Sequence, residues 1–288
     1  MHQLHPQKLE AALYVVATPI GNLRDITLRA IDVLSAADVV AAEDTRNTAH
    51  LLSHHGISAQ RLMAVHQHNE RGAADKIVAL LQSGQSVAFV SDAGTPAVSD
   101  PGALLVQAVL AAGLRVIPIP GASAAIAALS ASGLAAPHFL FYGFLPNKSA
   151  ARCSALQTLN EHPYTLVFYE APHRIVECVV DLNTVLGGER QIVLAREVTK
   201  LFETIHACRL NEAEAWLLSD SNQQRGEFVV LVSGAEPPSG LSAETLATLT
   251  LLLDELPLKQ AVQLAAKISG ANRSELYQLA LQMKADSE

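Results

Sequence analysis

Three short segments rich in glycine, proline and polar side chains each follow a run of apolar residues, at 18–24, 91–96 and 120–124. In the second of them, Gly94 would let a ligand approach the backbone closely, and Thr95 offers a hydroxyl. The first segment lacks both the three glycines of a dinucleotide-binding fingerprint and the lysine of a phosphate-binding loop. The pattern therefore disfavours NAD and ATP as ligands and is compatible with a cofactor that carries no phosphate.

Two helix starts accompany these segments. Asp100 stands before Pro101, and an acid followed by proline predicts the N-cap and the first position of a helix. Another helix opens after Pro120, at Ser123 and Ala124, where free N–H groups could bind a carboxylate. A plain strand-to-helix turn explains this second start equally well, so both interpretations stay open.

The histidines and cysteines do not predict a metal site. His50 and His54 are four residues apart, with His66 and His68 nearby, but no other group converges with them as a zinc site would need. No metal is therefore expected. The chain has three cysteines outside any CxxC pair, which is typical of reduced thiols in a cytosolic protein: Cys153, Cys178 and Cys208.

The composition is that of an aliphatic, acidic chain long enough for two domains. Half of the 288 residues are hydrophobic but only 5% are aromatic, which is typical of parallel sheets covered by helices. The formal net charge of −8 disfavours a general attraction to nucleic acid, so RNA binding would require a local patch. No run of 18 apolar residues predicts a membrane span, and residues 1–10 lack the apolar stretch of a signal peptide. A cytoplasmic location is expected.

Apolar runs alternate with helical patterns through the first half of the chain. Strands are expected at 13–18, 38–42, 62–66, 86–90 and 115–119. Helices are expected at 27–36, 47–54, 70–82 and 101–112, followed by a small-residue helix that runs to about residue 132. This alternation predicts a parallel sheet covered by helices, whose ligands bind beyond the carboxyl ends of the strands.

The second half has a different rhythm. Strands are expected at 139–144, 165–169, 191–196, 203–208 and 227–233, with helices at 149–159, 173–186 and 211–218. The fourth of these strands follows the third too closely for a helical crossover, which indicates a mixed sheet. The predicted fold class is therefore α/β, with a parallel-sheet domain at 12–134 and a mixed-sheet domain at 137–235.

A helical tail is expected at 241–285, after a linker that contains two prolines. Its helices are predicted at 241–253, 258–268 and 273–283, with Gly270 joining the last two. Apolar residues at helical spacing form one stripe on the middle helix: Ala261, Leu264, Ala265 and Ile268. A helix-turn-helix and a plain helical hairpin both fit this outline.

A set of short motifs occurs in order along the chain. They are Pro19-Ile20-Gly21-Asn22-Leu23, Glu43-Asp44-Thr45-Arg46, Ser91-Asp92-Ala93-Gly94-Thr95-Pro96, Asp100-Pro101-Gly102, Pro120-Gly121, Gly143-Phe144-Leu145-Pro146, Phe168-Tyr169-Glu170, His173-Arg174, Ala195-Arg196-Glu197-Val198-Thr199-Lys200 and Gly226-Glu227. With this set, residues 12–284 resemble the 16S ribosomal RNA (cytidine-2′-O)-methyltransferase family of the tetrapyrrole methylase superfamily. The resemblance implies a tetrapyrrole-methylase-like fold, a homodimer, and S-adenosyl-L-methionine held between two α/β domains. It also implies that the methyl acceptor is a cytidine ribose in the decoding centre of the small ribosomal subunit.

The resemblance further implies which residues contact the cofactor. Pro19 and Gly21 would lie at the cofactor cleft, and Asp92, Gly94 and Thr95 would contact the methionine part. The other implied contacts are Ser123 and Ala124 in the same pocket, Tyr169 beside the cofactor, and Gly226 with Glu227 near the adenine.

Methyl transfer to a ribose 2′-hydroxyl needs a base or a stabilising cation, because the hydroxyl is a weak acid. The candidate catalytic residues are Lys200, Glu43 and Glu170. A salt bridge from Lys200 to Glu197 or Glu203 is the structural alternative. Three arginines are candidates for contacts to RNA phosphates: Arg24, Arg46 and Arg174.

Two other functions stay open. A methylase of a tetrapyrrole or another small acidic metabolite would share the fold, although the 43–46 and 169–174 stretches and the tail favour ribosomal RNA. A cofactor-binding module that holds a partner through its tail would show no turnover. Labelled cofactor and small ribosomal subunits would distinguish an enzyme from such a module.

Overall fold

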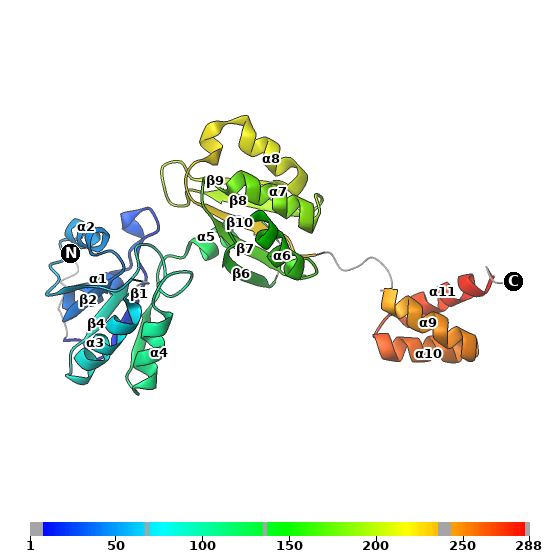
Figure 1. Ribbon diagram of the computed structural model, residues 1–288, viewed down its shortest axis with the longest axis horizontal. Coiled ribbons are helices and arrows are strands. Elements are labelled where there is room, and N and C mark those ends of the chain that lie inside the picture. Colours follow the sequence, from blue (N-terminus) through cyan, green and yellow to red (C-terminus); the bar gives the residue numbers. More distant parts are fainter. Residues whose placement is uncertain (1–7, 67–68, 135–136, 236–242, 286–288) are drawn as a thin grey trace. The chain divides into compact units, whose positions relative to one another are not determined.

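The computed structural model describes residues 8–66, 69–134, 137–235 and 243–285, with side chains in the last range from 244 to 283. Contacts divide the chain into a unit that ends at Gly234 and a second unit that begins at Ala235 (Figure 1). The first unit holds two separate five-stranded sheets, and the second is helical.

The first sheet is parallel throughout, as its strand–helix alternation predicts. Its strands are β1 (Leu13–Val16), β2 (Val39–Ala42), β3 (Leu62–Ala64), β4 (Val87–Val90) and β5 (Val116–Ile119). They lie in the order β3-β2-β4-β1-β5, with every neighbouring pair parallel. Because β1 lies between β4 and β5, the loops that follow these three strands meet at one edge of the sheet.

Helices cover both faces of this sheet. One face packs against α1 (Leu28–Ala36) and α2 (Thr45–His54), and the other against α3 (Glu70–Gln82) and α4 (Ala103–Ala111). Alternate strand residues serve the two cores: Tyr14 and Val16 pack with α1, whereas Leu13 and Phe89 pack with α3 and α4. A sheet buried on both faces accounts for the nearly continuous apolar runs in its strands.

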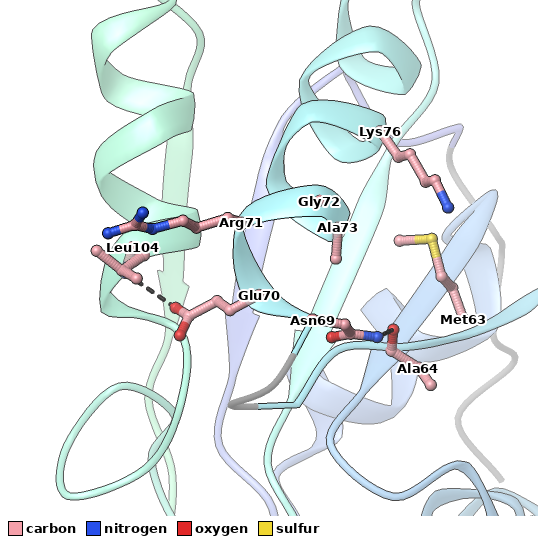
Figure 2. Close-up of a pocket in the computed structure, with 9 residues that line it drawn as sticks. All are labelled: Met63, Ala64, Asn69, Glu70, Arg71, Gly72, Ala73, Lys76 and Leu104. Carbon is pink, nitrogen blue, oxygen red and sulfur yellow. Dashed lines mark hydrogen bonds between the residues drawn. The ribbon is translucent and has the colours of Figure 1, made fainter.

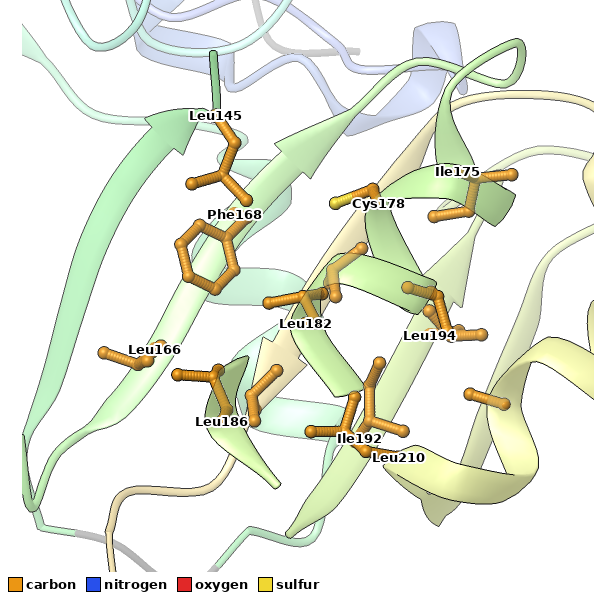
Figure 3. Close-up of a cluster of buried hydrophobic side chains, with 14 of the residues drawn as sticks. Leu145, Leu166, Phe168, Ile175, Cys178, Leu182, Leu186, Ile192, Leu194 and Leu210 are labelled. Carbon is orange, nitrogen blue, oxygen red and sulfur yellow. The ribbon is translucent and has the colours of Figure 1, made fainter. Parts of the chain in front are cut away.

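The second sheet is mixed, which the short connection before its fourth strand predicts. Its strands are β6 (Phe139–Phe144), β7 (Thr165–Glu170), β8 (Gln191–Arg196), β9 (Thr204–Arg209) and β10 (Phe228–Val232). The order is β6-β7-β10-β8-β9, where only β6 and β7 are parallel. Figure 3 shows the core on one face, which joins strand residues such as Phe168 and Leu194 to Leu182. The covering helices are α6 (Ser149–Leu159), α7 (Ile175–Leu186) and α8 (Leu210–Ser219).

Helix α5 (Ala124–Ala131) covers the opposite face of this second sheet (Figure 1). Its buried residues Ala125 and Ala128 pack on Val167, Val193 and Val229. The helix therefore lies within the sequence range expected for the first domain but completes the core of the second sheet. Small alanine side chains allow the helix to approach the strands closely.

The tail contains three helices, α9 (Ala243–Glu255), α10 (Leu258–Ser269) and α11 (Arg273–Ala285). Their core is formed by Leu249, Val262, Ala265, Leu276 and Ala280. Helix α10 ends at Gly270, whose φ of 71° is left-handed, and a short turn leads into α11. Of the predicted stripe, Ala261 and Ala265 are buried, whereas Leu264 and Ile268 are exposed.

The prediction that Asp100 caps a helix is wrong. Helix α4 begins at Ala103, after Gly102, without a side-chain cap from Asp100. Instead, the buried carboxylate of Glu70 accepts hydrogen bonds from the N–H groups of Gly102, Leu104 and Leu105, at 2.9–3.2 Å. An acid 32 residues away in sequence thus satisfies the free N–H groups of this helix, which leaves Asp100 available for another role.

Candidate functional site

A cavity of about 310 Å³ lies between the carboxyl edge of the first sheet and the second sheet. The loops after β1, β4 and β5 contribute Ile20, Ala93, Gly94, Thr95, Val98, Ser99, Asp100, Ser123 and Ala124. The second sheet and its loops contribute Phe144, Tyr169, Glu170, Ala171, Pro172, Ala195, Val198, Lys200, Glu227, Phe228 and Val229. The cavity is thus built where sequence analysis places the three binding loops, and its other wall comes from the second domain.

Backbone hydrogen bonds hold the three loops together. Thr18 and Gly94 exchange N–H···O bonds of 2.9 and 3.0 Å, which join the loop after β1 to the loop after β4. The Thr95 hydroxyl donates to the Ala122 carbonyl at 3.2 Å, which joins β4 to β5. Since Thr18 uses both polar backbone groups of Gly94, this glycine provides space beside the cavity rather than a free hydrogen-bond donor.

The charged groups of the cavity differ in their partners. Glu170 forms an ion pair with Arg174, with Oε1 and Nε 3.1 Å apart, and Glu227 forms one with Lys200. Asp100 has no ion-pair partner among the residues that the structure describes. Burial, with the nearby charges of Glu43 and Asp92, raises the pKa of Asp100 to about 6.

Lys200 is held between two carboxylates. Its Nζ lies 2.8 Å from Glu197 and 2.7 Å from Glu227, whereas the predicted alternative partner Glu203 instead accepts the N–H of Thr199. Burial disfavours the ammonium, but the hydrogen bonds to both carboxylates outweigh it and raise the pKa of Lys200. The side chain therefore presents a positive charge to the cavity at neutral pH.

Several residues expected at the cofactor lie outside the cavity lining. Pro19 is buried, and the Asp92 carboxylate accepts hydrogen bonds from the N–H of Asp44 and the side chain of Asn47. A Cβ on Gly21 would meet Lys200 Cγ at 2.5 Å, and a Cβ on Gly226 would overlap Glu197. These two glycines allow the chain to pack closely around Lys200 and its partner Glu197, so they support the site without lining the cavity.

None of the three candidate substrate arginines lines the cavity. Arg46 is exposed and forms an ion pair of 2.6 Å with Asp44, which also caps α2. Arg24 lies in the short 3₁₀ turn Leu23–Asp25. Arg174 is largely buried and donates to the carbonyls of Leu145 and Pro146 in addition to Glu170. Both Nη groups donate to the protein, so the structure gives Arg174 a role in shaping the cavity wall.

Glu43 and Glu170 differ in their access to the cavity. The Glu43 carboxylate lies outside the lining and accepts the N–H of Asp92 at 3.4 Å, and burial raises its pKa. Glu170 lines the cavity, but its buried carboxylate is bound by Arg174 and by the N–H of Ala171. Asp100 is thus a carboxylate of the cavity lining that has no ion-pair partner among the described residues, although it shares a hydrogen bond with Ser91. The only sequence feature that indicates Asp100 is its place in the motif Asp100-Pro101-Gly102.

A second cavity, of about 470 Å³, lies beside the start of α3 (Figure 2). It is lined by Met63, Asn69, Arg71, Lys76 and Leu104 among others, and contains none of the predicted site residues. Glu70 reaches from its rim to the start of α4. Among the described residues no group of three histidine, cysteine or acidic side chains could hold a metal ion; His68 lies outside them.

The chain is similar to known proteins over nearly its whole length. Residues 12–214 match the family described as tetrapyrrole (corrin/porphyrin) methylases. The chain is 54% identical to ribosomal RNA small subunit methyltransferase I of Pseudomonas aeruginosa, over 96% of this chain and 98% of that protein. It is 50% identical to the enzyme of the same name from Escherichia coli O157:H7, over 96% of both chains. The chain belongs to the ribosomal RNA small subunit methyltransferase I family.

The tail of this family member has its own match. Residues 239–284 match the family described as the RsmI C-terminal HTH domain, which favours the helix-turn-helix over the plain hairpin. Solved structures confirm the tetrapyrrole-methylase fold: the methyltransferase CobJ superposes with a TM-score of 0.58 at 22% identity, covering 78% of this chain and 94% of that one. Uroporphyrin-III C-methyl transferase from Thermus thermophilus, complexed with S-adenyl homocysteine, gives 0.54 at 19% identity, covering 76% and 96%.

Within the described ranges, no helix is both long and apolar enough to cross a membrane. The three cysteines are free thiols, with Cys178 buried in the core of the second sheet.

Proposed function

We propose that this protein transfers a methyl group from S-adenosyl-L-methionine to the ribose 2′-hydroxyl of a cytidine in 16S ribosomal RNA. The observation that carries the proposal is the cavity that the two sheets enclose. The chain around it shares 54% and 50% of its residues with two ribosomal RNA small subunit methyltransferases over nearly its whole length. The decoding centre of the small subunit is the proposed location of the cytidine. The protein would act in the cytoplasm, where ribosomal subunits are found, and as a homodimer.

The cavity suits this cofactor in size and charge. Its volume of about 310 Å³ lies near the lower end of the ~300–1,000 Å³ usual for ligand pockets. Most of its wall is apolar, Glu170 is compensated by Arg174, and Lys200 is shared between Glu197 and Glu227. Asp100 adds a negative charge without an ion-pair partner, which is favourable for a ligand that carries a positively charged sulfur. Gly94, Thr95, Ser123, Ala124 and Tyr169 are the residues proposed to hold it.

The bound cofactor supplies an electrophilic methyl carbon on a good leaving group. A ribose 2′-hydroxyl that attacked this carbon would have to give up its proton to a base of the protein. Asp100 is suited to accept this proton because its pKa of about 6 leaves it ionised at neutral pH. The ammonium of Lys200 stabilises negative charge that develops on the oxygen. Arg174 fixes Glu170 and the wall of the cavity.

Methyl transfer to isolated small subunits tests the proposal. Subunits from cells that lack this protein should accept label from radioactive cofactor, and mass mapping should place one methyl group on a single cytidine ribose. The reaction should proceed in EDTA, since the proposed chemistry involves no metal. Label that enters a tetrapyrrole or another small acidic metabolite but no RNA would favour the alternative methylase. Cofactor binding without any turnover would favour a binding module.

Gly94→Val should weaken cofactor binding at least tenfold. Its φ is 78°, and its Cβ would lie 3.4 Å from the Ile20 side chain, so a branched group fills space at the cavity wall. The backbone strain of a side chain at this φ costs about 1–2 kcal/mol in any case. Gly113→Val controls for this strain, because Gly113 has a φ of 70° and open space around its Cβ. Calorimetry and thermal melting of both variants provide the measurement; equal cofactor affinities would contradict the role of Gly94.

Neutralising the tail should weaken binding to the small subunit without affecting cofactor binding. Lys259, Lys267 and Arg273 are exposed and without ion pairs in the described part of the tail; the Lys284 side chain lies outside it. Changing the three to glutamine should make the slope of log K against log salt concentration shallower by up to about 2–3 units. Each lost phosphate contact accounts for ~0.7–0.9 of this change. A chain that ends after Gly240 should show the same loss.

The alternative is that the tail only stabilises the protein. The triple glutamine variant distinguishes the two roles, because exposed lysines and arginines contribute little to folding. Unchanged subunit affinity and salt dependence in this variant, together with a lower melting temperature of the truncated chain, would exclude an RNA-binding role.

A further inference from the structure

The turn between β8 and β9 carries Lys200 together with two strongly exposed apolar side chains. Leu201 is 89% exposed and Phe202 is 66% exposed, more than any other phenylalanine, tyrosine or tryptophan that the structure describes. Neither residue lines the cavity, whereas Lys200 does. Two adjacent, strongly exposed apolar side chains beside the cavity form a small apolar patch, which is a surface suited to bind another group.

The backbone of this turn is firmly held. Glu197 and Thr199 have φ values of 51° and 69°, which are costly for residues other than glycine. Thr199 Oγ1 accepts the N–H of Asn22 at 3.2 Å, which attaches the turn to the loop after β1. The Phe202 carbonyl accepts hydrogen bonds from Nη1 of Arg196 and from the hydroxyl of Thr204, both at 3.2 Å. The Phe202 ring is therefore presented from a fixed backbone rather than from a loose loop.

We propose that the exposed ring of Phe202 stacks on a base of the RNA substrate and so positions the ribose for Lys200. This inference rests on the proposed function. Lys200 and Phe202 are two residues apart, so their Cα atoms lie within ~7 Å, which is the scale that separates the sugar of a nucleotide from its own or a neighbouring base. Proteins commonly recognise unpaired RNA bases by stacking them on aromatic side chains.

A nucleobase fits this surface better than a second copy of the chain. A stable protein interface needs ~800 Å² per partner, whereas a buried aromatic side chain contributes only ~150–250 Å². The charged neighbours Lys200 and Glu203 flank the two apolar residues. A single exposed ring suits the flat apolar face of one nucleobase.

The test compares Phe202→Leu with Phe202→Trp in methyl transfer to small subunits. The leucine variant keeps an apolar side chain but cannot stack, so its KM for the subunit should rise about fivefold or more. The tryptophan variant should retain the KM of the unmodified protein. Both should keep the cofactor affinity and the molecular mass in solution. Phe139→Leu is the matched control, since Phe139 is exposed at the opposite end of β6 from the cavity residue Phe144.

Three results would overturn the inference. They are an unchanged KM in Phe202→Leu, an equal loss in Phe202→Trp, or a change in molecular mass that accompanies the loss and assigns the ring to a contact between copies. If the unmodified protein methylates no RNA, the proposed function itself fails. If it does methylate RNA and Phe202→Leu behaves identically, only the stacking role fails.

Discussion

Asp100→Asn should slow methyl transfer by about 10²-fold or more under single-turnover conditions, which is the usual loss on removing a positioned base. In the unmodified protein the rate should fall about tenfold for each pH unit below about 6, because a protonated Asp100 cannot accept the hydroxyl proton. The asparagine variant should lack this dependence. Asp75→Asn, on an exposed part of α3 outside the cavity, is the matched control.

The same variant should also be more stable than the unmodified protein at pH 7. Asp100 has a raised pKa in the folded chain, so the folded state retains a proton that the unfolded chain loses between pH 3.8 and about 6. Stability therefore falls as the pH rises through this window and stays lower above it. Asparagine removes this cost, and the difference in melting temperature should vanish below pH 3.8. A variant that is both inactive and more stable is the expected signature of a functional carboxylate.

Two outcomes would contradict this role of Asp100. If the cofactor dissociation constant rises by as much as the rate falls, the carboxylate acts on the charge of the cofactor rather than on the hydroxyl proton. If the rate is unchanged and only stability rises, Asp100 is a strained structural residue without a part in the chemistry.

Lys200→Met should reduce the single-turnover rate by about 10²- to 10³-fold, while cofactor affinity changes little. Removing one preorganised charge beside a developing oxyanion typically has an effect of this size. Methionine keeps most of the aliphatic stem that packs on Gly21, so the variant removes the ammonium without opening a gap. Because Glu197 and Glu227 raise the pKa of Lys200, the rate should show no dependence on its deprotonation near neutral pH.

The control for Lys200 is Lys8→Met, on an exposed residue that precedes β1 at the opposite edge of the first sheet. Rapid-quench measurements with saturating subunits separate the chemical step from binding. A rate equal to that of the unmodified protein would leave Lys200 as a structural partner of Glu197 and Glu227. A matching loss of cofactor affinity would place its charge at the cofactor instead of the hydroxyl.

Local patterns in the chain are sufficient to predict most of its helices and strands. Strand positions, helix positions and the parallel character of the first sheet follow from local periodicity and connection length, which neighbouring residues decide. The three loops of the cavity were predictable because parallel strands place their carboxyl ends at one edge. The ordered motifs indicated the family, and the tail was recognisable as helical from its apolar spacing.

Which side chains share a site depends on contacts between distant parts of the chain. The cap of α4 comes from Glu70, and Lys200 pairs with Glu227, 27 residues further along the chain, in addition to its sequence neighbour Glu197. Local spacing shows neither of these distant pairings, and it predicts a helix cap for Asp100, which instead lines the cavity. Helix α5 packs on the second sheet for the same reason: its alanines fit either sheet, and only the three-dimensional packing selects one. The spacing of apolar residues determines whether a segment forms a helix or a strand, whereas long-range contacts determine which residues each side chain packs against.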